Sequence, residues 1–357
     1  MTDEKQNELS ESKEIPHEIN SVSDLSQILQ TLGEPKEGHT RFFRGHGDEG
    51  WKLLPSIYRE TYLIENEDKI IKDALTYCPD DFSPSDTLFE KLVKLQHYGY
   101  STRLLDLTTN ALVALYFTAW NEQHYDKNGE LIIFDIPNEH IKYGDSDTVA
   151  ILSAISLQEF YADISKVIKH ANIVKDILEK RINEGYDFKK DKTLEEEIKL
   201  LRYLMTVDFK ERENYLEYQK EQYLRDFYLE VFNQDAAIFS LLHTIQMDKP
   251  GFRPLINPDD LQRVLCVRAK LNNQRISRQQ GCFLLFGIKD NKTEAAVIPN
   301  EWQRFALNSQ KILVKAKRKA DIRQELESFG ISKRTLFPEL EAQATEIMNY
   351  YKPQKTK

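Results

Sequence analysis

Three polar segments of the chain hold residues whose types and spacing could bind an anion. The first ends a strand-like run with Arg44, which is followed at once by Gly45. An arginine at the end of a strand presents a planar, always-charged fork of N–H donors, which suits a phosphate or a carboxylate. The alternative is a buried pair between Arg44 and a carboxylate that fixes the turn, and the residues alone favour neither reading.

The second segment, 96–109, gathers hydrogen-bonding side chains directly before an apolar run that starts at Ala111. Such a density of polar groups at the entrance to a core indicates a site, because exposure alone does not explain it. The structural alternative is that Arg103 pairs with Asp106 while the threonines cap the next helix. The candidate residues of this segment are His97, Tyr98, Ser101, Thr102, Arg103, Asp106 and Thr108.

The third segment, 272–283, places several amides and two arginines immediately before an apolar strand. Amides at the lip of a strand can meet a ligand, although polar residues before a strand more often form an ordinary loop. The candidates here are Arg275, Gln279 and Gln280. The chain shows no metal-ligand spacing, no P-loop and no glycine pattern of a dinucleotide-binding fold.

Predicted strands and helices must position these three polar segments. Strand-like runs cover 40–44, 130–136, 261–268, 281–286 and 295–298, and helical patterns cover 22–32, 63–75, 86–97, 111–120, 321–329 and 339–350. Between about 155 and 245 the chain changes to long, charged, amphipathic segments that predict two to four helices. This order predicts an α+β fold with a mixed or antiparallel sheet, flanking helices and a long helical insertion.

The bulk composition limits the classes of function. With 40% hydrophobic and 30% charged residues, the 357-residue chain has the composition of a globular protein. Its net charge of −9 gives no overall attraction to nucleic acid or to a membrane surface. A nucleic-acid alternative rests only on the basic pair Arg275 and Arg278 and on the basic run 315–319.

Cysteine usage and the polarity of the N-terminus bear on localisation. Cys78, Cys266 and Cys282 are an odd number without metal-ligand spacing, which favours a reducing cytoplasm. The acidic start of the chain is unlike a secretory signal, and no apolar stretch is long enough to span a membrane. We therefore expect a cytoplasmic protein without a membrane partner.

Taken in order, these motifs resemble the FRG-domain family. Its aromatic-Arg-Gly motif is found as Phe43-Arg44-Gly45, and its central signature is found at 96–108, followed by the apolar helix. Later motifs are found at 275–283 and 330–340. The polar, acidic start of the chain predicts a flexible lead-in over 1–20. The resemblance implies an FRG domain over 21–345 that includes the insertion at about 155–245, followed by a tail over 346–357. It also implies, loosely, a bacterial stress or phage-defence setting.

The same order of segments is similar to ADP-ribosyltransferases of the Arg-Ser-Glu type. That resemblance implies an arginine for the diphosphate of NAD, hydroxyls for the nicotinamide ribose and a carboxylate for the cationic transition state. The catalytic residues that it implies are Arg44, Thr102, Asp106 and Gln280. The binding residues are Arg44, Gly45, His97, Tyr98, Ser101, Arg103, Thr108, Arg275 and Gln279. Because a glutamine stands where the carboxylate is expected, Asp106 or a residue of the insertion would have to supply the negative charge.

The sequence therefore predicts a polar pocket that binds a nucleotide-like anion, with NAD as a hypothetical cofactor and ADP-ribosyltransferase-like catalysis as one hypothesis. A competing prediction is a non-catalytic sensor or interaction module. In that case the polar residues form a structural network, and the insertion at about 155–245 binds a partner protein.

Overall fold

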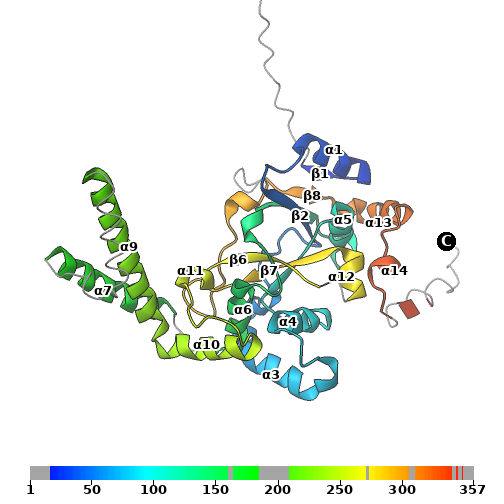
Figure 1. Ribbon diagram of the computed structural model, residues 1–357. Helices are drawn as coiled ribbons and strands as arrows, with labels where there is room; N and C mark the ends of the chain where they lie inside the picture. Colours follow the sequence, from blue (N-terminus) through cyan, green and yellow to red (C-terminus); the bar gives the residue numbers. More distant parts are fainter. Residues whose placement is uncertain are drawn as a thin grey trace, which may run out of the picture.

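The computed structural model describes residues 17–159, 164–184, 209–270, 273–304 and 310–339, together with 343, 344 and 348. Its centre is one eight-stranded sheet in the order β1-β8-β4-β2-β3-β7-β6-β5 (Figure 1). The pairs β1–β8 and β5–β6 are parallel, and the other five pairs are antiparallel. The strands are β1 Glu18–Ile19, β2 His39–His46, β3 Leu104–Thr108, β4 Gly129–Pro137, β5 Ile141–Tyr143, β6 Val264–Arg268, β7 Gly281–Phe286 and β8 Ile312–Val314. The predicted α+β fold with a mixed sheet is confirmed.

Helices cover the sheet and continue beyond it. They are α1 Val22–Leu32, α2 Thr61–Glu65, α3 Glu67–Tyr77, α4 Leu88–His97, α5 Ala111–Ala119, α6 Asp147–Ala154, α7 Ile164–Asn183, α9 Phe209–Asn233, α10 Ala236–Asp248, α11 Pro258–Leu261, α12 Gln274–Gln279, α13 Lys319–Ser328 and α14 Lys333–Leu336. Local signals explain several boundaries. The Ser21 side chain caps α1, which ends at Gly33 with a positive φ of 67°, and the Asn110 side chain caps α5.

Two apolar clusters place helices against opposite parts of the sheet. One cluster joins α1, α5 and α13 to β2, β4 and β8. Another joins α4, α6 and α10 to β3, β6 and β7. Since α5 is apolar nearly all round, it is buried at the centre of the first cluster, as its composition predicts. Helices α7 and α9 extend away from the sheet (Figure 1).

Several predicted elements need correction. The run 63–75 is divided into α2 and α3 at Asn66, and the strand predicted from 261 begins only at Val264, because α11 precedes it. The run 295–298 contributes one isolated bridge, between Ile288 and Ala295. Gln274 and Gln279 belong to α12 instead of a loop, with Asn273 as its N-cap and Gln280 as its C-cap, while Asn272 lies outside the described residues.

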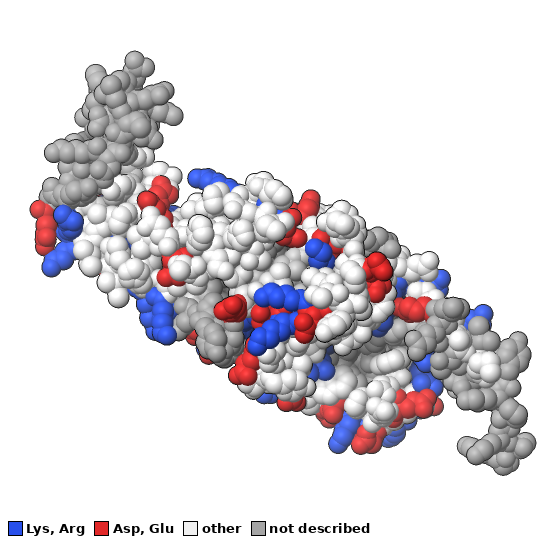
Figure 2. Space-filling model, turned by 90° about the horizontal axis from the view of Figure 1, so that it is seen from below, with Lys and Arg blue, Asp and Glu red and all other residues white. Residues whose placement is uncertain are grey.

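Other predictions fall partly or wholly outside the described residues. Most of the last predicted helix, 339–350, lies there, as does part of the insertion, of which α7, α9 and α10 are described. The domain boundaries therefore stay predictions. Among the described residues, no helix combines the length and apolar character needed to cross a membrane. On the face drawn in Figure 2, acidic and basic side chains are interspersed, and its described part shows no continuous basic area.

Candidate functional site: an arginine-lined pocket

The pocket lies where two neighbouring strands separate. Strands β2 and β3 pair at Phe43 and Thr108, and continuing that register would place Gly45 opposite Asp106. No such pair forms within the two strands. Instead, Nη1 of Arg44 donates a hydrogen bond of 2.7 Å to the backbone oxygen of Asp106 and lies 4.0 Å from its carboxylate. The arginine side chain thus satisfies a carbonyl that a continued ladder would have used.

Gly45 allows a helix to approach this strand closely. A Cβ atom at this position would lie 2.0 Å from the carbonyl oxygen of Ala114 and 2.9 Å from the backbone nitrogen of Thr118. Any larger residue would therefore have to displace α5 from β2. Because α5 also carries Phe117, which lines the pocket, the glycine positions an apolar wall while its neighbour supplies the charge.

Burial shapes the electrostatics of Arg44. Burial lowers the pKa of Arg44 to about 10, against the opposing influence of Asp106, so the guanidinium remains charged at neutral pH. Its Nε donates to Nε2 of His46 over 2.9 Å. Burial, and then the charge of Arg44, lower the pKa of His46 to about 3. The imidazole is therefore neutral at pH 7, which is the state that can accept this hydrogen bond.

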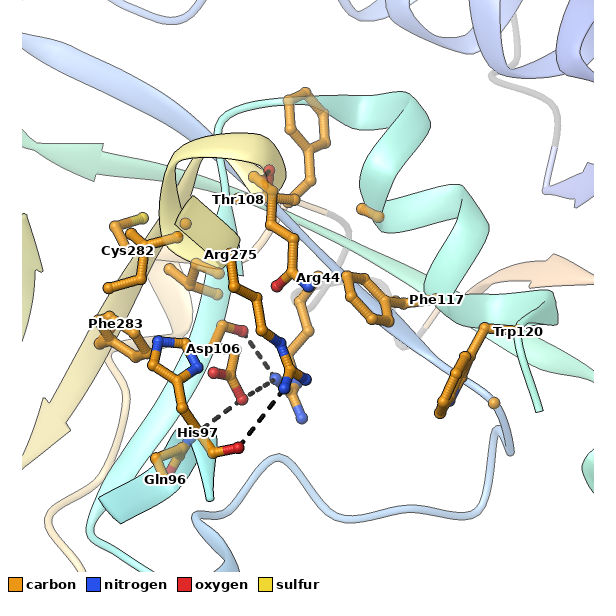
Figure 3. A pocket seen from close by; sticks show the side chains of 18 of the residues that line it. Arg44, Gln96, His97, Asp106, Thr108, Phe117, Trp120, Arg275, Cys282 and Phe283 are labelled. Carbon is orange, nitrogen blue, oxygen red and sulfur yellow. Dashed lines mark hydrogen bonds and ion pairs between the residues drawn. The ribbon is translucent and has the colours of Figure 1, made fainter. Parts of the chain in front are cut away.

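A second arginine reaches the same cavity from the other side. Arg275 lies in the first turn of α12, whose N-cap Asn273 accepts hydrogen bonds from the backbone of Arg275 and Ile276. The guanidinium lies 4.6 Å from the ring centre of Phe337. In Figure 3 the side chains of Arg44 and Arg275 extend into the same part of the pocket, beside Asp106 and His97.

The contacts of Arg275 leave donors unused. Its Nη1 donates to the backbone oxygen of His97 at 3.5 Å and lies 3.8 Å from the carboxylate of Glu339. Its Nε and the Nε2 of His97 are buried, and neither has a hydrogen-bond partner among the described residues. Burial, and then the charge of Arg275, lower the pKa of His97. Unused buried donors beside a cavity are what an anionic ligand would satisfy.

The cavity between these groups has a volume of about 240 Å³. One part of its wall is apolar and aromatic, and the other carries the two arginines. Asp106 is the one acidic residue among the lining residues, and its side chain is 60% exposed. The lining residues are Phe43, Arg44, Gly45, Gly47, Trp51, Gln96, His97, Asp106, Leu107, Thr108, Ala114, Phe117, Trp120, Asn121, Arg275, Ile276, Gln279, Gly281, Cys282 and Phe283.

Seven of the predicted site residues meet at this cavity. They come from all three polar segments, and hydrogen bonds join the segments to one another. The hydroxyl of Thr108 donates to the backbone oxygen of Gln279 at 2.7 Å, which fixes α12 against the end of β3. The seven residues are Arg44, Gly45, His97, Asp106, Thr108, Arg275 and Gln279.

The other predicted site residues do not line the cavity. Tyr98 is exposed and lines a neighbouring groove, and Ser101 lines neither. Thr102 is buried, and its hydroxyl donates to the side chain of Gln96. Gln280 ends α12 in a left-handed conformation with φ of 48°, and its side chain accepts from the hydroxyl of Thr109 at 3.3 Å.

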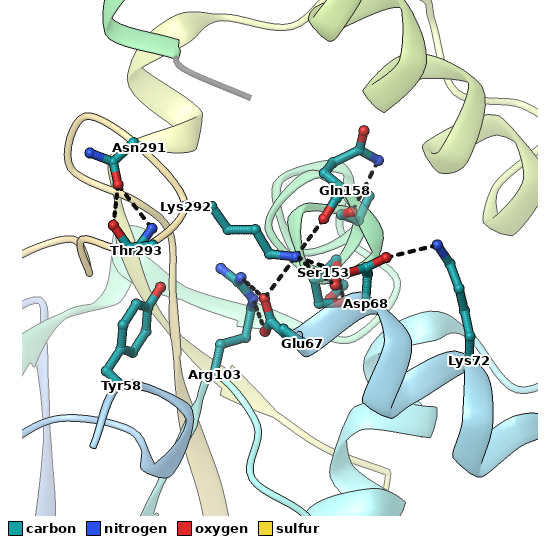
Figure 4. Close-up of polar contacts among 12 residues, drawn as sticks. Tyr58, Glu67, Asp68, Lys72, Arg103, Ser153, Gln158, Asn291, Lys292 and Thr293 are labelled. Carbon is teal, nitrogen blue, oxygen red and sulfur yellow. Dashed lines mark hydrogen bonds and ion pairs between the residues drawn. The ribbon is translucent and has the colours of Figure 1, made fainter. Parts of the chain in front are cut away.

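Arg103 requires the largest correction. The proposed pair with Asp106 is wrong, because Arg103 forms a two-pronged ion pair with Glu67 and both side chains are fully buried. The carboxylate of Glu67 also lies 3.5 Å from Nζ of Lys292, which Figure 4 shows beside both Glu67 and Asp68. Burial explains the difference: Asp106 is the one exposed residue of β3, whereas Arg103 immediately precedes the strand and is fully buried.

Sequence reasoning missed the aromatic part of the site. Phe117 and Trp120 line the cavity from the C-terminal end of α5, and Trp51 lines it from the loop after β2. The spacing of three between Phe117 and Trp120 was a usable signal, because it places two side chains on one face of a helix. Trp51 carried no comparable signal. No group of three or more metal-ligating side chains is found in the part of the chain that the structure describes.

Fold and site together define a mixed α+β protein with an arginine-lined pocket at the point where its central strands separate. A family model described as the FRG domain matches residues 39–127, so an FRG domain is present in this part of the chain. The match includes β2, α4, β3 and α5 and contains 14 of the 20 lining residues, whereas Arg275 and Gln279 lie beyond it. No curated protein and no solved structure matches the chain.

Proposed function

We propose that the pocket binds a small, nucleotide-like anion, and that this binding is the central function of the FRG-domain part of the chain. The observation that carries the proposal is the presence of two arginines from distant segments, Arg44 on β2 and Arg275 on α12, at one cavity. Two guanidinium groups and one lining carboxylate, Asp106, give the cavity walls a net positive charge. Such a charge suits a phosphate group, which arginine can bind with two parallel hydrogen bonds.

Ligand-dependent thermal unfolding tests this proposal. A ligand that binds only the native state raises the unfolding temperature, by roughly 5 °C at a concentration of about 100 times Kd. We expect AMP, ATP, ADP-ribose or NAD to produce such a shift. Arg275→Gln should abolish the shift, whereas Arg253→Gln, which changes an exposed arginine outside the cavity, should retain it.

Circular dichroism separates binding from folding. Arg275→Gln and Arg44→Gln should retain the wild-type spectrum, because their guanidinium groups face the cavity. Unfolding of both variants would instead favour the structural-network alternative. The absence of a shift with every ligand, or an undiminished shift in Arg275→Gln, would contradict the proposal.

A second candidate function is ADP-ribosyltransferase-like catalysis. The observation that favours it is the carboxylate of Asp106, which lines the same cavity as Arg44 and supplies the negative charge that Gln280 lacks. In this reaction the bond between the nicotinamide nitrogen and the ribose of NAD breaks. A nucleophile then bonds to the ribose carbon and loses its proton, and nicotinamide leaves as a neutral molecule. A carboxylate stabilises the positive charge that develops on the ribose.

Release of nicotinamide from NAD in a cell extract tests the second candidate. Asp106→Asn should reduce the rate by about 100-fold, because it removes the charge and keeps the shape of the side chain. Asp73→Asn, on an exposed face of α3, is the matched control. A wild-type protein that binds NAD but releases no nicotinamide would leave binding as the function and exclude this chemistry.

Partner binding by the insertion stays a prediction, as do a cytoplasmic location and a stress or phage-defence role. What supports an interaction surface is α7, where Ile173 and Ile177 are exposed one turn apart. A partner protein that binds through this surface should be lost from the double variant Ile173→Asp, Ile177→Asp and retained by Lys175→Asp. Equal retention by both variants would exclude this face.

A further inference from the structure

Two of the three tryptophans of the chain line the arginine pocket and remain partly exposed. Trp51 is 40% exposed and Trp120 is 37% exposed, whereas Trp302 is buried. Large aromatic side chains that remain accessible beside a pocket are enriched where proteins bind ligands and partners. Their position therefore indicates that the pocket binds an aromatic part of a ligand in addition to an anionic group.

The ring of Trp120 is supported from behind. It stacks on Phe337 with a centroid distance of 5.1 Å and an interplanar angle of 22°. Phe117 contacts the same Phe337 ring edge-on at 6.2 Å. In Figure 3 Trp120 and Phe117 lie on the side of the pocket opposite His97 and Cys282, with the two guanidinium groups between them. One indole face is thus covered by protein, and the side chain forms a fixed platform for a further planar ring.

The loop that carries Trp51 is fixed by the buried Lys319. Nζ of Lys319 donates to the backbone oxygen of Gly47 at 2.6 Å and to that of His124 at 2.7 Å. These two bonds join the loop that carries Trp51 to the segment that follows α5. The indole of Trp51 contacts His46 and His124 edge-on, at centroid distances of 5.8 and 5.0 Å. Both tryptophans are therefore positioned by contacts outside the cavity.

The size of the cavity limits the ligand. Its volume of about 240 Å³ lies below the range of roughly 300–1,000 Å³ that is typical of small-molecule sites. A single nucleotide matches such a volume better than a dinucleotide does. Two further lining residues, Asp106 and Asn121, carry a carboxylate and an amide that offer partners for sugar hydroxyls.

We infer that the ligand is a mononucleotide whose base stacks on Trp120 and whose phosphate lies between Arg44 and Arg275. This inference rests on the proposed function and names the ligand class of the same pocket. Trp51 lines the same cavity, and a dinucleotide would place only one of its halves inside it.

Binding of AMP, ribose 5-phosphate and inorganic pyrophosphate to the full chain tests this inference. Titrations of the wild type are compared with Trp120→Leu, Trp51→Leu and Arg275→Gln, and Tyr77→Leu serves as the control for an exposed aromatic outside the cavity. Stacking of a base on an aromatic side chain contributes about 1–3 kcal/mol, so Trp120→Leu should weaken AMP binding by about 5- to 150-fold. Its affinity for ribose 5-phosphate and for pyrophosphate should stay within about two-fold of the wild type, since neither carries a ring that can stack.

Intrinsic fluorescence adds a readout that a purely structural role would not change. AMP should quench tryptophan emission in the wild type and in Tyr77→Leu, and quench it less in Trp120→Phe. Arg275→Gln should lower the affinity of the protein for AMP, ribose 5-phosphate and pyrophosphate alike.

The possible failures are distinguishable. If AMP binding depends on Arg275 but is unchanged in Trp120→Leu, the inference is wrong and the proposed function stands. If a folded Trp120→Leu protein loses affinity for AMP and for pyrophosphate equally, the inference is also wrong and the proposed function also stands. If none of the three ligands binds to the wild type but ATP, ADP-ribose or NAD does, the inference is wrong and the proposed function stands. If none of these ligands binds, both proposals are wrong.

Discussion

Arg103 and Arg44 are buried arginines at the ends of neighbouring strands, but their surroundings differ in one respect. The buried part of the cluster around Arg103 contains two cations, Arg103 and Lys292, and two carboxylates, Glu67 and Asp68, and the exposed Lys72 also pairs with Asp68. The remaining donors of that cluster reach backbone oxygens, with Nη1 of Arg103 at 3.1 Å from Phe286 and Nζ of Lys292 at 3.3 Å from Ser156 (Figure 4). Charges and hydrogen bonds are balanced there without a ligand.

The pocket around Arg44 is not balanced in this way. Arg44 and Arg275 lie 4.0 and 3.8 Å from the carboxylates of Asp106 and Glu339, which are 60% and 47% exposed. Buried nitrogens of His97 and Arg275 lack partners among the described residues. A buried polar group without a partner destabilises the native state unless something satisfies it. The comparison teaches that burial of an arginine does not by itself mark a site. What distinguishes the two regions is whether the protein supplies all the partners itself.

The largest effect is expected in the closed cluster. Glu67→Gln removes the negative charge between Arg103 and Lys292 and leaves two buried cations with only Asp68 nearby. We expect the free energy of unfolding to fall by about 3–5 kcal/mol, because breaking a buried ion pair leaves an uncompensated charge. Urea unfolding measures this change.

Asp73→Asn is the matched control for Glu67→Gln, since Asp73 is exposed on the same helix. It should change the free energy of unfolding by less than about 0.5 kcal/mol. If Glu67→Gln also changes the free energy of unfolding by less than about 0.5 kcal/mol, the ion-pair cluster contributes little to stability. The contrast between a self-satisfied cluster and an open pocket would then be wrong.

A smaller effect is expected from the acid titration of His46, beside Arg44. Its pKa is about 3 in the native state, far below the value of about 6.5 expected in the unfolded chain. Between these values the unfolded state binds the proton and the native state does not, so stability is lost as the pH falls below about 6.5. The slope contributed by one such group is at most about 1.4 kcal/mol per pH unit.

Unfolding measured at pH 7, 6 and 5 checks this prediction. His46→Asn, which keeps an acceptor for Nε of Arg44, should flatten the pH dependence. His243→Asn, at an exposed position on α10, should leave it unchanged. A wild-type slope that persists in His46→Asn would show that another group is responsible.

The smallest effect is expected at the edge of the open pocket. The carboxylate of Glu339 lies 3.8 Å from Nη1 of Arg275 and is 47% exposed, so it competes with an incoming anion for this guanidinium. Glu339→Gln should therefore tighten the binding of AMP or pyrophosphate by about three-fold, since partly exposed ion pairs contribute about 0–1 kcal/mol.

Titration of Glu339→Gln with either ligand measures the change in Kd. Glu327→Gln, on an exposed part of α13, is the control for a general change in net charge. Unchanged or weaker binding in Glu339→Gln would mean that this carboxylate does not oppose the ligand.

Local chemistry explains what could be predicted of the fold. The helix over 22–32, the strand that carries Arg44 and the buried helix after Asn110 follow from caps, glycine stops and apolar periodicity, which act within a few residues. Strands β1, β5 and β8 were missed because they have only two or three residues each. Such segments are strands only because neighbouring strands pair with them.

The sequence by itself determined the three polar segments and the Arg44–Gly45 pair. It could not determine which of Arg44 and Arg103 lines a pocket and which is buried in an ion pair, because both are arginines beside strands in motifs of similar polarity. Only the tertiary structure brought Glu67 to Arg103 from 36 positions away and brought Arg275, Trp51 and Trp120 to one cavity. The physical reason is that a charge buried in a core depends on partners from distant segments, and the chain must fold before those partners meet.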